Sequence, residues 1–383
     1  MKVYSGGRIP VKIWLDDIED GAMKQITNLS NLPFAFKHIA IMPDVHQGYG
    51  MPIGGVLATQ GVVIPNAVGV DIGCGMCAVK TSLTKLSTET LKKIMGVIRE
   101  TIPVGFNHNK ERQDKSFMPS LERGCICERE YQSARYQVGT LGGGNHFIEI
   151  QKGSDGHIWI MIHSGSRNLG KQVADHYNKT AVKLNEKWNP IVPKEWELAF
   201  LPLDSNEGED YLIEMNYCVE FAFKNRFLMM ERVKEAFSKH VDCSFEPMIN
   251  IAHNHARMEH HFGKDVMVHR KGATSARLNE IGIIPGSQGT KSYIVKGRGN
   301  PESFHSCSHG AGRKMGRKQA TRELDLNEEI KKLNDQGIVH GIRTVRDLDE
   351  ASGAYKDIST VMENQKDLVD IVVELSPLGV IKG

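Results

Sequence analysis

Short apolar stretches that end in clusters of Asp, Cys and His recur along these 383 residues, and no other feature constrains the fold as strongly. Five clusters stand out: PDVHQG at 43–48, DIGCG at 71–75, GNHFIE at 144–149, HSGSR at 163–167 and HNHARMEHH at 253–261. No repeat, low-complexity tract or Gly/Ser linker divides the chain between them. If the clusters converge, one site is assembled from distant segments. We therefore expect a single large α+β domain over residues 1–383, with mixed or antiparallel sheets and surrounding helices.

Hydrophobic periodicity and turn residues predict where the secondary-structure elements lie. Apolar runs that alternate with Gly and Pro indicate short strands in residues 1–85, 138–167 and 266–295. Helical spacing predicts helices near 85–97, 169–187, 211–240 and 324–335. Residues 107–128 are polar and charged, and we expect an exposed insertion there. Residues 188–204 contain Pro and Trp, and we expect a surface connection.

Charge and composition limit the possible partners. Lys and Arg total 48 against 46 Asp and Glu, so the net charge of +2 gives no whole-chain argument for nucleic-acid binding, and any polyanion site must be local. The opening MKVYSGGRIPVKIW lacks the apolar core of a signal peptide, and the apolar run at 61–72 is too short and too broken to span a membrane. We expect a cytoplasmic location. Seven cysteines in such a chain indicate free thiols or metal ligands rather than disulfides.

The residue types in these clusters suit a divalent metal. Asp, Cys and His together favour manganese, zinc or iron(II), because a thiolate is too soft a ligand for magnesium. His146, His163 and His253 each end an apolar run within a Gly- or Asn-containing turn, where a side chain can point into a site. Cys74 lies between two glycines and three residues after Asp71, so its thiolate could bridge two cations. A small buried core cysteine in a Gly-rich turn is the alternative, and the sequence leaves it open.

The segment SCSHGAGRKMGRKQA, residues 306–320, suits a phosphate group. Its glycines allow the backbone to approach a ligand, and Arg313 and Arg317 would share one face if a helix begins there. Guanidinium groups match phosphate oxygens. His309, directly before the turn, is placed to act as a nucleophile toward phosphorus, whereas a helix-capping turn is the structural alternative. The chain has no Walker A loop, no GxGxxG and no KxDG motif, so that lysine motif cannot carry a covalent nucleotide.

Seven motifs in a fixed order give the chain a resemblance to a known family. PDVHQGYGMPIGG, GVDIGCGM, GTLGGGNHFIE, HSGSRNLG, IPGSQGTKSY, SCSHGAGR and AYKDI occur in the order typical of the RtcB family of RNA-splicing ligases, and the chain ends LGVIKG. The resemblance implies an RtcB-like fold and a GTP-dependent RNA ligase that acts in RNA splicing or repair. Such an enzyme joins RNA 3′-phosphate or 2′,3′-cyclic phosphate ends to 5′-hydroxyl ends through a GMP-histidine. It also implies a possible archease-like activator.

The resemblance also implies roles for individual residues. Two manganese ions would share Cys74, with Asp71 and His146 completing one site and His163 and His253 the other, and His309 would be the nucleophile. Nucleotide contacts would come from Asn145, His146, Phe147, Ile148, Glu149, His253, Asn254, Pro285, Gly286, Ser287, Gln288, Ser292, His309, Gly310, Ala311, Gly312 and Lys382. Phosphate or RNA contacts would come from Asp44, Arg167, Lys271, Arg313 and Arg317. Gln288 and Gly316 depart from the family pattern, which usually has Met and Ser at these positions.

Two other function classes compete with a ligase. A dinuclear metal-dependent phosphoesterase would use the same kind of metal ligands to activate water. It would need neither the terminal lysine nor the histidine of HGAGR. A non-enzymatic RNA-binding protein fits less well, because the chain is nearly neutral and only 7% aromatic.

Overall fold

Two large sheets form the framework of the protein. The computed structural model describes residues 1–121, 123–188 and 192–383. A six-stranded sheet has the order β1 (Lys2–Tyr4), β2 (Val11–Ile13), β3 (Ala35–His46), β4 (Ile53–Thr59), β12 (Lys264–Lys271) and β11 (Asn254–His261). A seven-stranded sheet has the order β10 (Ile249–Ala252), β6 (Gly75–Lys80), β8 (Ile158–Ser164), β7 (Phe147–Gly153), β17 (Val369–Lys382), β15 (Ser292–Gly297) and β14 (Ile281–Ile284). Within the described chain, only β2 and β3 pair in parallel. The expected α+β class with largely antiparallel sheets is confirmed.

Two small ladders and a set of helices complete the described part of the chain. The ladders pair β13 (Ala273–Ser275) with β16 (Ser306–Ser308) and β5 (Val62–Val63) with β9 (Leu201–Pro202). The helices are α1 (Asp20–Ser30), α2 (Pro65–Val68), α3 (Thr88–Thr101), α4 (Cys125–Gln137), α5 (Arg167–Lys187), α6 (Asn206–Ser238), α7 (Arg317–Glu323), α8 (Leu326–Asp335) and α9 (Ile358–Asn364). None of the described helices is both long and apolar enough to cross a bilayer.

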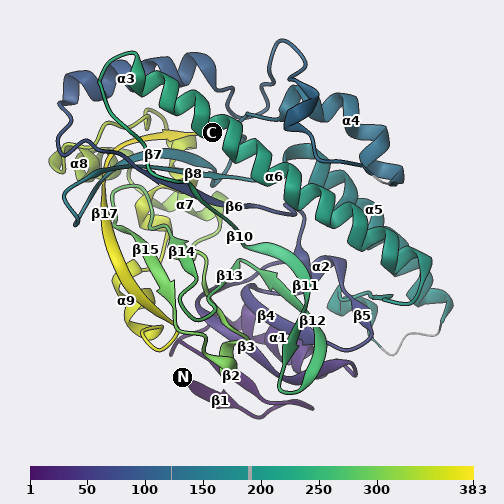
Figure 1. Ribbon diagram of the computed structural model, residues 1–383. Coiled ribbons are helices and arrows are strands. Elements are labelled where there is room, and N and C mark those ends of the chain that lie inside the picture. Colours follow the sequence, from purple (N-terminus) through teal and green to yellow (C-terminus); the bar gives the residue numbers. More distant parts are fainter. Residues whose placement is uncertain (122, 189–191) are drawn as a thin grey trace.

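One hydrophobic core lies between α3, α6 and the seven-stranded sheet. Figure 1 shows α3 and α6 across the top of the molecule, the seven-stranded sheet beneath them and the six-stranded sheet at the bottom. Met229, Val233 and Phe237 of α6 are fully buried against Ile160 and Ile162 of β8. Ser205 starts α6 by accepting a hydrogen bond from the backbone N–H of Gly208.

Most of the predicted elements occur, with shifted boundaries. The four predicted helices correspond to α3, α5, α6 and α8. The strand-only prediction for residues 1–85 is wrong at α1, where Ala22, Ile26 and Leu29 form a buried stripe at helical spacing.

The two segments predicted to be exposed are only partly so. Residues 107–116 are largely exposed, but the segment ends in α4, where the buried carboxylate of Glu214 accepts hydrogen bonds from the backbone N–H groups of Ile126 and Cys127. In the connection at 188–204, Leu198 and Leu201 are fully buried, because this segment pairs with β5 and packs into the core. Residues 122 and 189–191 of these segments lie outside the described residues.

The register of the seven-stranded sheet brings the ends of several neighbouring strands together at one end of the sheet. Gly75 at the start of β6 lies opposite Ser164 at the end of β8 and Ala252 at the end of β10. Phe147 at the start of β7 lies opposite both His163 of β8 and Lys382 of β17. Because all five strands start or end here, residues distant in sequence meet at this end of the sheet.

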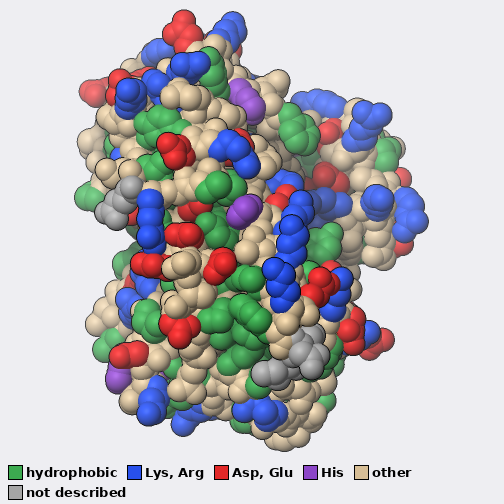
Figure 2. Space-filling model, turned by 90° about the vertical axis from the view of Figure 1, so that its right-hand side faces the viewer, with side chains coloured by type: hydrophobic (Ala, Val, Ile, Leu, Met, Phe, Trp, Pro, Cys, Tyr) green, Lys and Arg blue, Asp and Glu red, His purple; other side chains and the backbone are tan. Residues whose placement is uncertain are grey.

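The molecular surface carries both signs of charge. On the face drawn in Figure 2, Lys and Arg side chains are interspersed with Asp and Glu side chains. This distribution agrees with the net charge of +2 and leaves local features to provide any affinity for a polyanion.

Candidate metal and nucleotide site

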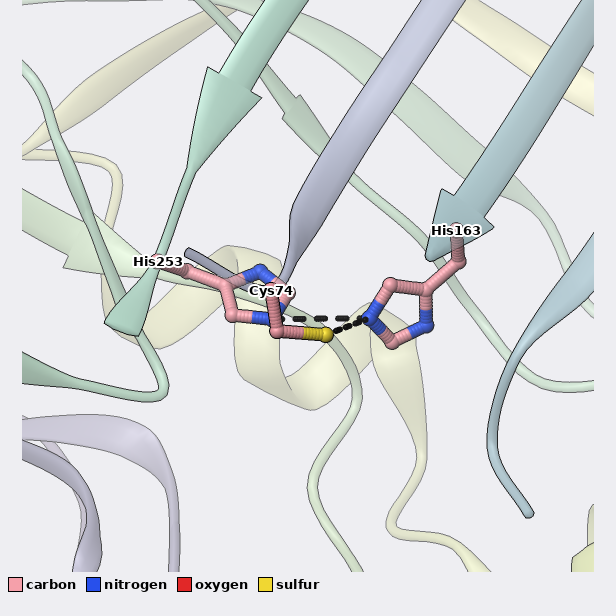
Figure 3. A group of neighbouring side chains, drawn as sticks. All are labelled: Cys74, His163 and His253. Carbon is pink, nitrogen blue, oxygen red and sulfur yellow. Dashed lines mark hydrogen bonds between the residues drawn. The ribbon is translucent and has the colours of Figure 1, made fainter. Parts of the chain in front are cut away.

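Five side chains converge at this end of the seven-stranded sheet. The Sγ atom of Cys74 lies 3.4 Å from Nε2 of His146 and 3.3 Å from Nε2 of His163. His163 Nε2 is also 3.4 Å from His253 Nε2, and His146 Nε2 is 3.1 Å from a carboxylate oxygen of Asp71. Figure 3 shows Cys74, His163 and His253 pointing toward one another from three separate segments.

The five residues form two groups that share Cys74. One group is Asp71, Cys74 and His146, and the other is Cys74, His163 and His253; within each, the possible ligand atoms lie within 4.8 Å of one another. The opposite ring nitrogens of two histidines are already engaged: Nδ1 of His146 is 3.0 Å from the carbonyl oxygen of Leu141, and Nδ1 of His163 is 3.1 Å from that of Asn145. An Nδ1–H that donates to a carbonyl leaves Nε2 with its lone pair free for a cation.

Burial sets the protonation of this cluster. It lowers the pKa values of His163 and His253 well below the ordinary histidine range, and neighbouring histidines add to the effect. These rings are therefore neutral, as metal ligation requires. Burial and the nearby Asp71 raise the pKa of the Cys74 thiol well above its usual value. A cation would have to displace that proton, so metal binding here must release protons.

The loop that carries Cys74 needs glycine on both sides. Gly73 has a φ of +72°, and a Cβ there would lie 2.7 Å from the backbone of Val219. A Cβ on Gly75 would meet the carbonyl oxygen of Ile251 at 2.0 Å. The backbone is also held by Arg226 of α6, whose buried guanidinium donates to the carbonyl oxygens of Gly73 and Ser164. Arg226 belongs to none of the motifs, and the sequence analysis missed it.

His309 follows β16 directly and lies next to the metal-ligand cluster. Its ring centroid lies 4.7 Å from that of His253. Its Nδ1 is 2.6 Å from Oδ2 of Asp44, and the same oxygen accepts hydrogen bonds from the backbone N–H groups of His309 and Gly310. Burial alone would raise the pKa of Asp44, but His309 outweighs it and holds that pKa below its usual value. Asp44, expected among the phosphate or RNA contacts, is thus fully buried and instead orients His309.

A cavity of about 1030 Å³ opens over these residues. Its lining includes most of the expected site residues, namely Asp71, Cys74, Asn145, Phe147, Glu149, His163, His253, Asn254, Lys271, Pro285, Gly286, Ser287, Gln288, His309, Gly310, Ala311, Gly312, Arg313, Arg317 and Lys382. Five expected site residues lie outside the lining: Asp44 and His146, whose contacts are given above, and Ile148, Ser292 and Arg167. Ile148 faces the core under α6, because alternate strand residues point to opposite faces. The hydroxyl of Ser292 accepts a hydrogen bond from the N–H of Gly286, and Arg167 donates to Thr140 and to the carbonyl of Gly105.

One wall of the cavity combines an aromatic ring with an ammonium and a buried carboxyl group. The ammonium of Lys382 lies 5.8 Å from the ring centroid of Phe147. Burial raises the pKa of Glu149 to about 8, although hydrogen bonding from Gln151 opposes the shift. The side-chain N–H of Gln288 donates to the carbonyl oxygen of Glu350 at 3.1 Å, while its buried Oε1 has no partner in the described structure. A buried acceptor of this kind calls for a donor from a ligand.

The two arginines of the 306–320 segment are brought together by one carboxylate. Arg313 lies before α7 and not within it, so the expectation that Arg313 and Arg317 share one helix face is wrong. The buried Glu350 instead accepts hydrogen bonds from Arg313 Nη1 at 2.9 Å, from Arg317 Nε at 2.7 Å and from the Tyr355 hydroxyl. Tyr355 belongs to the AYKDI motif, whereas no motif contains Glu350.

Lys271 and Asn254, which were expected to contact phosphate and nucleotide, use their polar groups in hydrogen bonds to neighbouring loops. The Lys271 ammonium donates to the carbonyl oxygens of Tyr49 at 2.6 Å and Asn66 at 3.0 Å, and burial lowers its pKa to about 7. The Asn254 side chain donates to the carbonyl oxygen of Asp71 and accepts from the N–H of Gly272, each within 3.0 Å. These contacts bring the metal-ligand loop and the loops around Tyr49 and Gly272 to the same cavity.

Comparison with known proteins gives a consistent result along the chain. A family model described as "tRNA-splicing ligase RtcB" matches residues 25–126 and 113–383. The chain is 38% identical over 401 residues to the "RNA-splicing ligase RtcB" of Escherichia coli strain K12, an alignment that covers 98% of this chain and 97% of that protein. It is 32% identical over 459 residues to the "tRNA-splicing ligase RtcB" of Thermococcus kodakarensis, with 98% and 95% covered. All of the expected site residues that line the cavity lie within the residues matched by the family model.

Proposed function

This chain belongs to the RtcB family of tRNA-splicing ligases, and on that premise we propose that it joins an RNA 3′-phosphate end to an RNA 5′-hydroxyl end with GTP as co-substrate. A 2′,3′-cyclic phosphate end would first be opened to the 3′-phosphate. The observation that carries the proposal is the place of His309, between Asp44 on its Nδ1 side and the metal-ligand cluster on the other.

His309 is the proposed nucleophile. With Nδ1–H donating to the Asp44 carboxylate, the lone pair on Nε2 is free to attack the α-phosphorus of GTP. The Nε2–P bond forms while the bond from phosphorus to the β-phosphate oxygen breaks, and pyrophosphate leaves. The positive charge that develops on the ring is stabilised by Asp44, which is fully buried and close to Nδ1.

Two further transfers complete the proposed reaction. An oxygen of the RNA 3′-phosphate attacks the guanylyl phosphorus, and the bond to His309 Nε2 breaks, which returns the neutral ring. The 5′-hydroxyl oxygen of the second RNA end then attacks the 3′-phosphate phosphorus, loses its proton and releases GMP. Arg313 and Arg317, held in place by Glu350, are suited to bind the phosphate oxygens at this stage.

The two groups that share Cys74 fit a pair of divalent cations. One thiolate, three imidazoles and one carboxylate form a donor set that suits manganese, zinc or iron(II), and His253 has a buried Nδ1 and an Nε2 directed at the cluster. Bound cations would supply Lewis-acid stabilisation of charge on the phosphoryl oxygens. Manganese in particular is part of the proposal.

The nucleotide would occupy the wall formed by Phe147, Glu149, Gln288 and Lys382. An aromatic face, a buried carboxyl group and a partly buried ammonium offer stacking, a hydrogen-bond partner and a donor to a purine base. The arrangement distinguishes a ligase from a phosphoesterase, since hydrolysis of a phosphate needs no such base-binding wall.

A product analysis tests the proposal against the phosphoesterase. The protein is incubated with manganese, a 3′-phosphate RNA and a 5′-hydroxyl RNA, with and without GTP. We expect a joined strand that forms only with GTP, together with GMP and pyrophosphate. RNA that loses its 3′-phosphate without GTP and is never joined would establish the phosphoesterase instead.

A further inference from the structure

The aromatic ring of Tyr49 is exposed at the mouth of the cavity although its backbone is firmly held. The residue is 71% exposed and lines the cavity, as does its neighbour there, Val70, which is 49% exposed. The carbonyl oxygen of Tyr49 accepts a hydrogen bond from Lys271, and the adjacent Gly48 exchanges two hydrogen bonds with the Gln25 side chain. A tyrosine ring on a fixed loop at a ligand cavity offers a flat apolar face on which another ring can stack.

A series of contacts links the nucleotide wall to the loop of Tyr49 by way of His309. Ring-to-ring contacts run from Phe147 to His163 at 5.7 Å, from His163 to His253 at 5.1 Å and from His253 to His309 at 4.7 Å. A Cβ built on Gly272 would lie 3.0 Å from Cε1 of His309, and the preceding residue, Lys271, donates to the carbonyl oxygen of Tyr49. Phe147, His309 and Tyr49 therefore belong to one continuous site and line the same cavity.

The same cavity carries cations that are suited to a polyanion. Lys314, Lys318 and Arg322, on and next to α7, are exposed and line the cavity, and none of them forms an ion pair with another described residue. A volume of about 1030 Å³ lies at the upper limit of roughly 300–1,000 Å³ for a pocket that holds one small molecule. Space, unpaired positive charge and an exposed aromatic ring together fit a nucleic-acid end better than a second small ligand.

We propose that Tyr49 stacks on the nucleobase at one of the RNA ends to be joined, and so holds that end beside His309. The proposal rests on the proposed function, because it takes the guanylyl group to occupy the Phe147 wall. The chemistry is that of an unstacked base on an aromatic face, whichever of the two RNA ends supplies it. Lys271 acts as a positioning residue for the ring, through the carbonyl oxygen of Tyr49.

Binding of labelled RNA, followed by fluorescence anisotropy, tests the proposal without requiring catalysis. The oligonucleotides are a 3′-phosphate strand and a 5′-hydroxyl strand, each with a normal or an abasic terminal nucleotide. We expect Tyr49→Ala to raise the Kd of one of the two strands about tenfold, and Tyr49→Phe, which keeps the ring, to bind like wild type. Leu278→Ala is the matched control, because Leu278 is 72% exposed but lies outside the cavity lining.

The abasic strands show whether the base itself contacts Tyr49. For the strand that stacks, the abasic substitution should weaken binding to wild type as much as Tyr49→Ala does, and should cause no further loss in that variant. The strand that shows this pattern identifies which RNA end lies on the ring. Equal losses from the abasic substitution in wild type and Tyr49→Ala, or unchanged binding of both strands by Tyr49→Ala, would overturn the proposal.

The proposal and the function it rests on fail in different ways. A wild-type protein that shows the Tyr49 pattern in binding but never joins RNA would contradict the ligase and leave the stacking site standing. A wild-type protein that joins RNA while Tyr49→Ala binds and joins it equally well would contradict only the stacking site. Loss of the GTP-dependent adduct in Tyr49→Ala, a reaction without RNA, would assign Tyr49 to the fold and overturn the proposal.

Discussion

The Nδ1 atom of His309 lies 2.6 Å from Oδ2 of Asp44, although 265 residues separate them in the sequence. Because the Asp44 carboxylate accepts a hydrogen bond from Nδ1, the ring keeps its lone pair on Nε2, and the ring lies 4.7 Å from that of His253 in the metal-ligand cluster. The position of the proton on the proposed nucleophile therefore depends on a long-range contact with Asp44 and not on the motif that contains His309.

Asp44→Asn is expected to slow the transfer of GMP from GTP by about 10²–10⁴-fold. An amide at this position can donate to Nδ1, which leaves the proton on Nε2 and removes the attacking lone pair. The rate of adduct formation from GTP labelled at the α-phosphate measures the effect. Joining of RNA that already carries GMP on its 3′-phosphate should fall much less, and an equal loss in both assays would mean that Asp44 supports the site as a whole.

Cys74→Ala should abolish binding of both cations while the protein stays folded, because the thiolate belongs to both ligand groups. We expect manganese affinity to fall more than about 100-fold. Elemental analysis of the folded variant gives the metal content. Cys77→Ala is the matched control, since Cys77 is fully buried in the core and outside both groups. A full manganese complement in Cys74→Ala would contradict the shared-ligand arrangement.

The loss of Lys382 should weaken GTP binding, although it is the penultimate residue. A chain end is usually frayed, but here Lys382 pairs with Phe147 in the sheet and is partly buried. Deletion of residues 382–383 and the substitution Lys382→Met should both raise the Kd for GTP, the latter by about 10–100-fold through loss of a charged hydrogen-bond donor. Isothermal titration calorimetry measures the change. Lys382→Met isolates the ammonium, because it keeps Gly383, whose N–H donates to His146; an unchanged affinity in this variant would exclude a role for the charge.

The free energy of unfolding should depend on pH through the carboxyl group of Glu149. Burial raises the pKa of its carboxyl group from 4.5 to about 8 in the folded protein. Between these values the native state holds a proton that the unfolded state has released, so the free energy of unfolding must fall as pH rises through this range. Glu149→Gln should remove the part of this decrease in the free energy of unfolding that comes from Glu149, which is at most about a few kcal/mol. Melting temperatures of the GTP-free protein and the variant at pH 5.5 and pH 8 check it; parallel pH profiles would show that Glu149 is ionised throughout.

The sequence predicted the chemistry of the site better than its supporting contacts. The three histidines are recognisable because each ends an apolar run within a turn, and Cys74 because it lies between two glycines three residues after Asp71. The helix α6 was predicted from its periodicity, but Arg226 on that helix gave no sign that it would hold the Cys74 loop. Its role depends on the packing of α6 against the sheet, which is a tertiary property.

Long-range contacts explain the remaining differences. The resemblance places Asp44 among the phosphate or RNA contacts, and only the fold shows that its carboxylate accepts a hydrogen bond from His309. Arg313 and Arg317 were placed on one helix from their spacing, yet Glu350, which lies outside every motif, is what brings them together. The helix α1 was missed because its single buried stripe lies within a region dominated by Gly, Pro and strand-like runs.

Mapping of the covalent nucleotide tests the central claim most directly. The protein is incubated with manganese and GTP labelled at the α-phosphate, digested under conditions that preserve phosphoramidates and analysed by mass spectrometry. We predict one labelled peptide, with GMP on His309, and no adduct in His309→Ala. An adduct that persists in His309→Ala, or GMP mapped to another residue of the wild-type protein, would contradict the account.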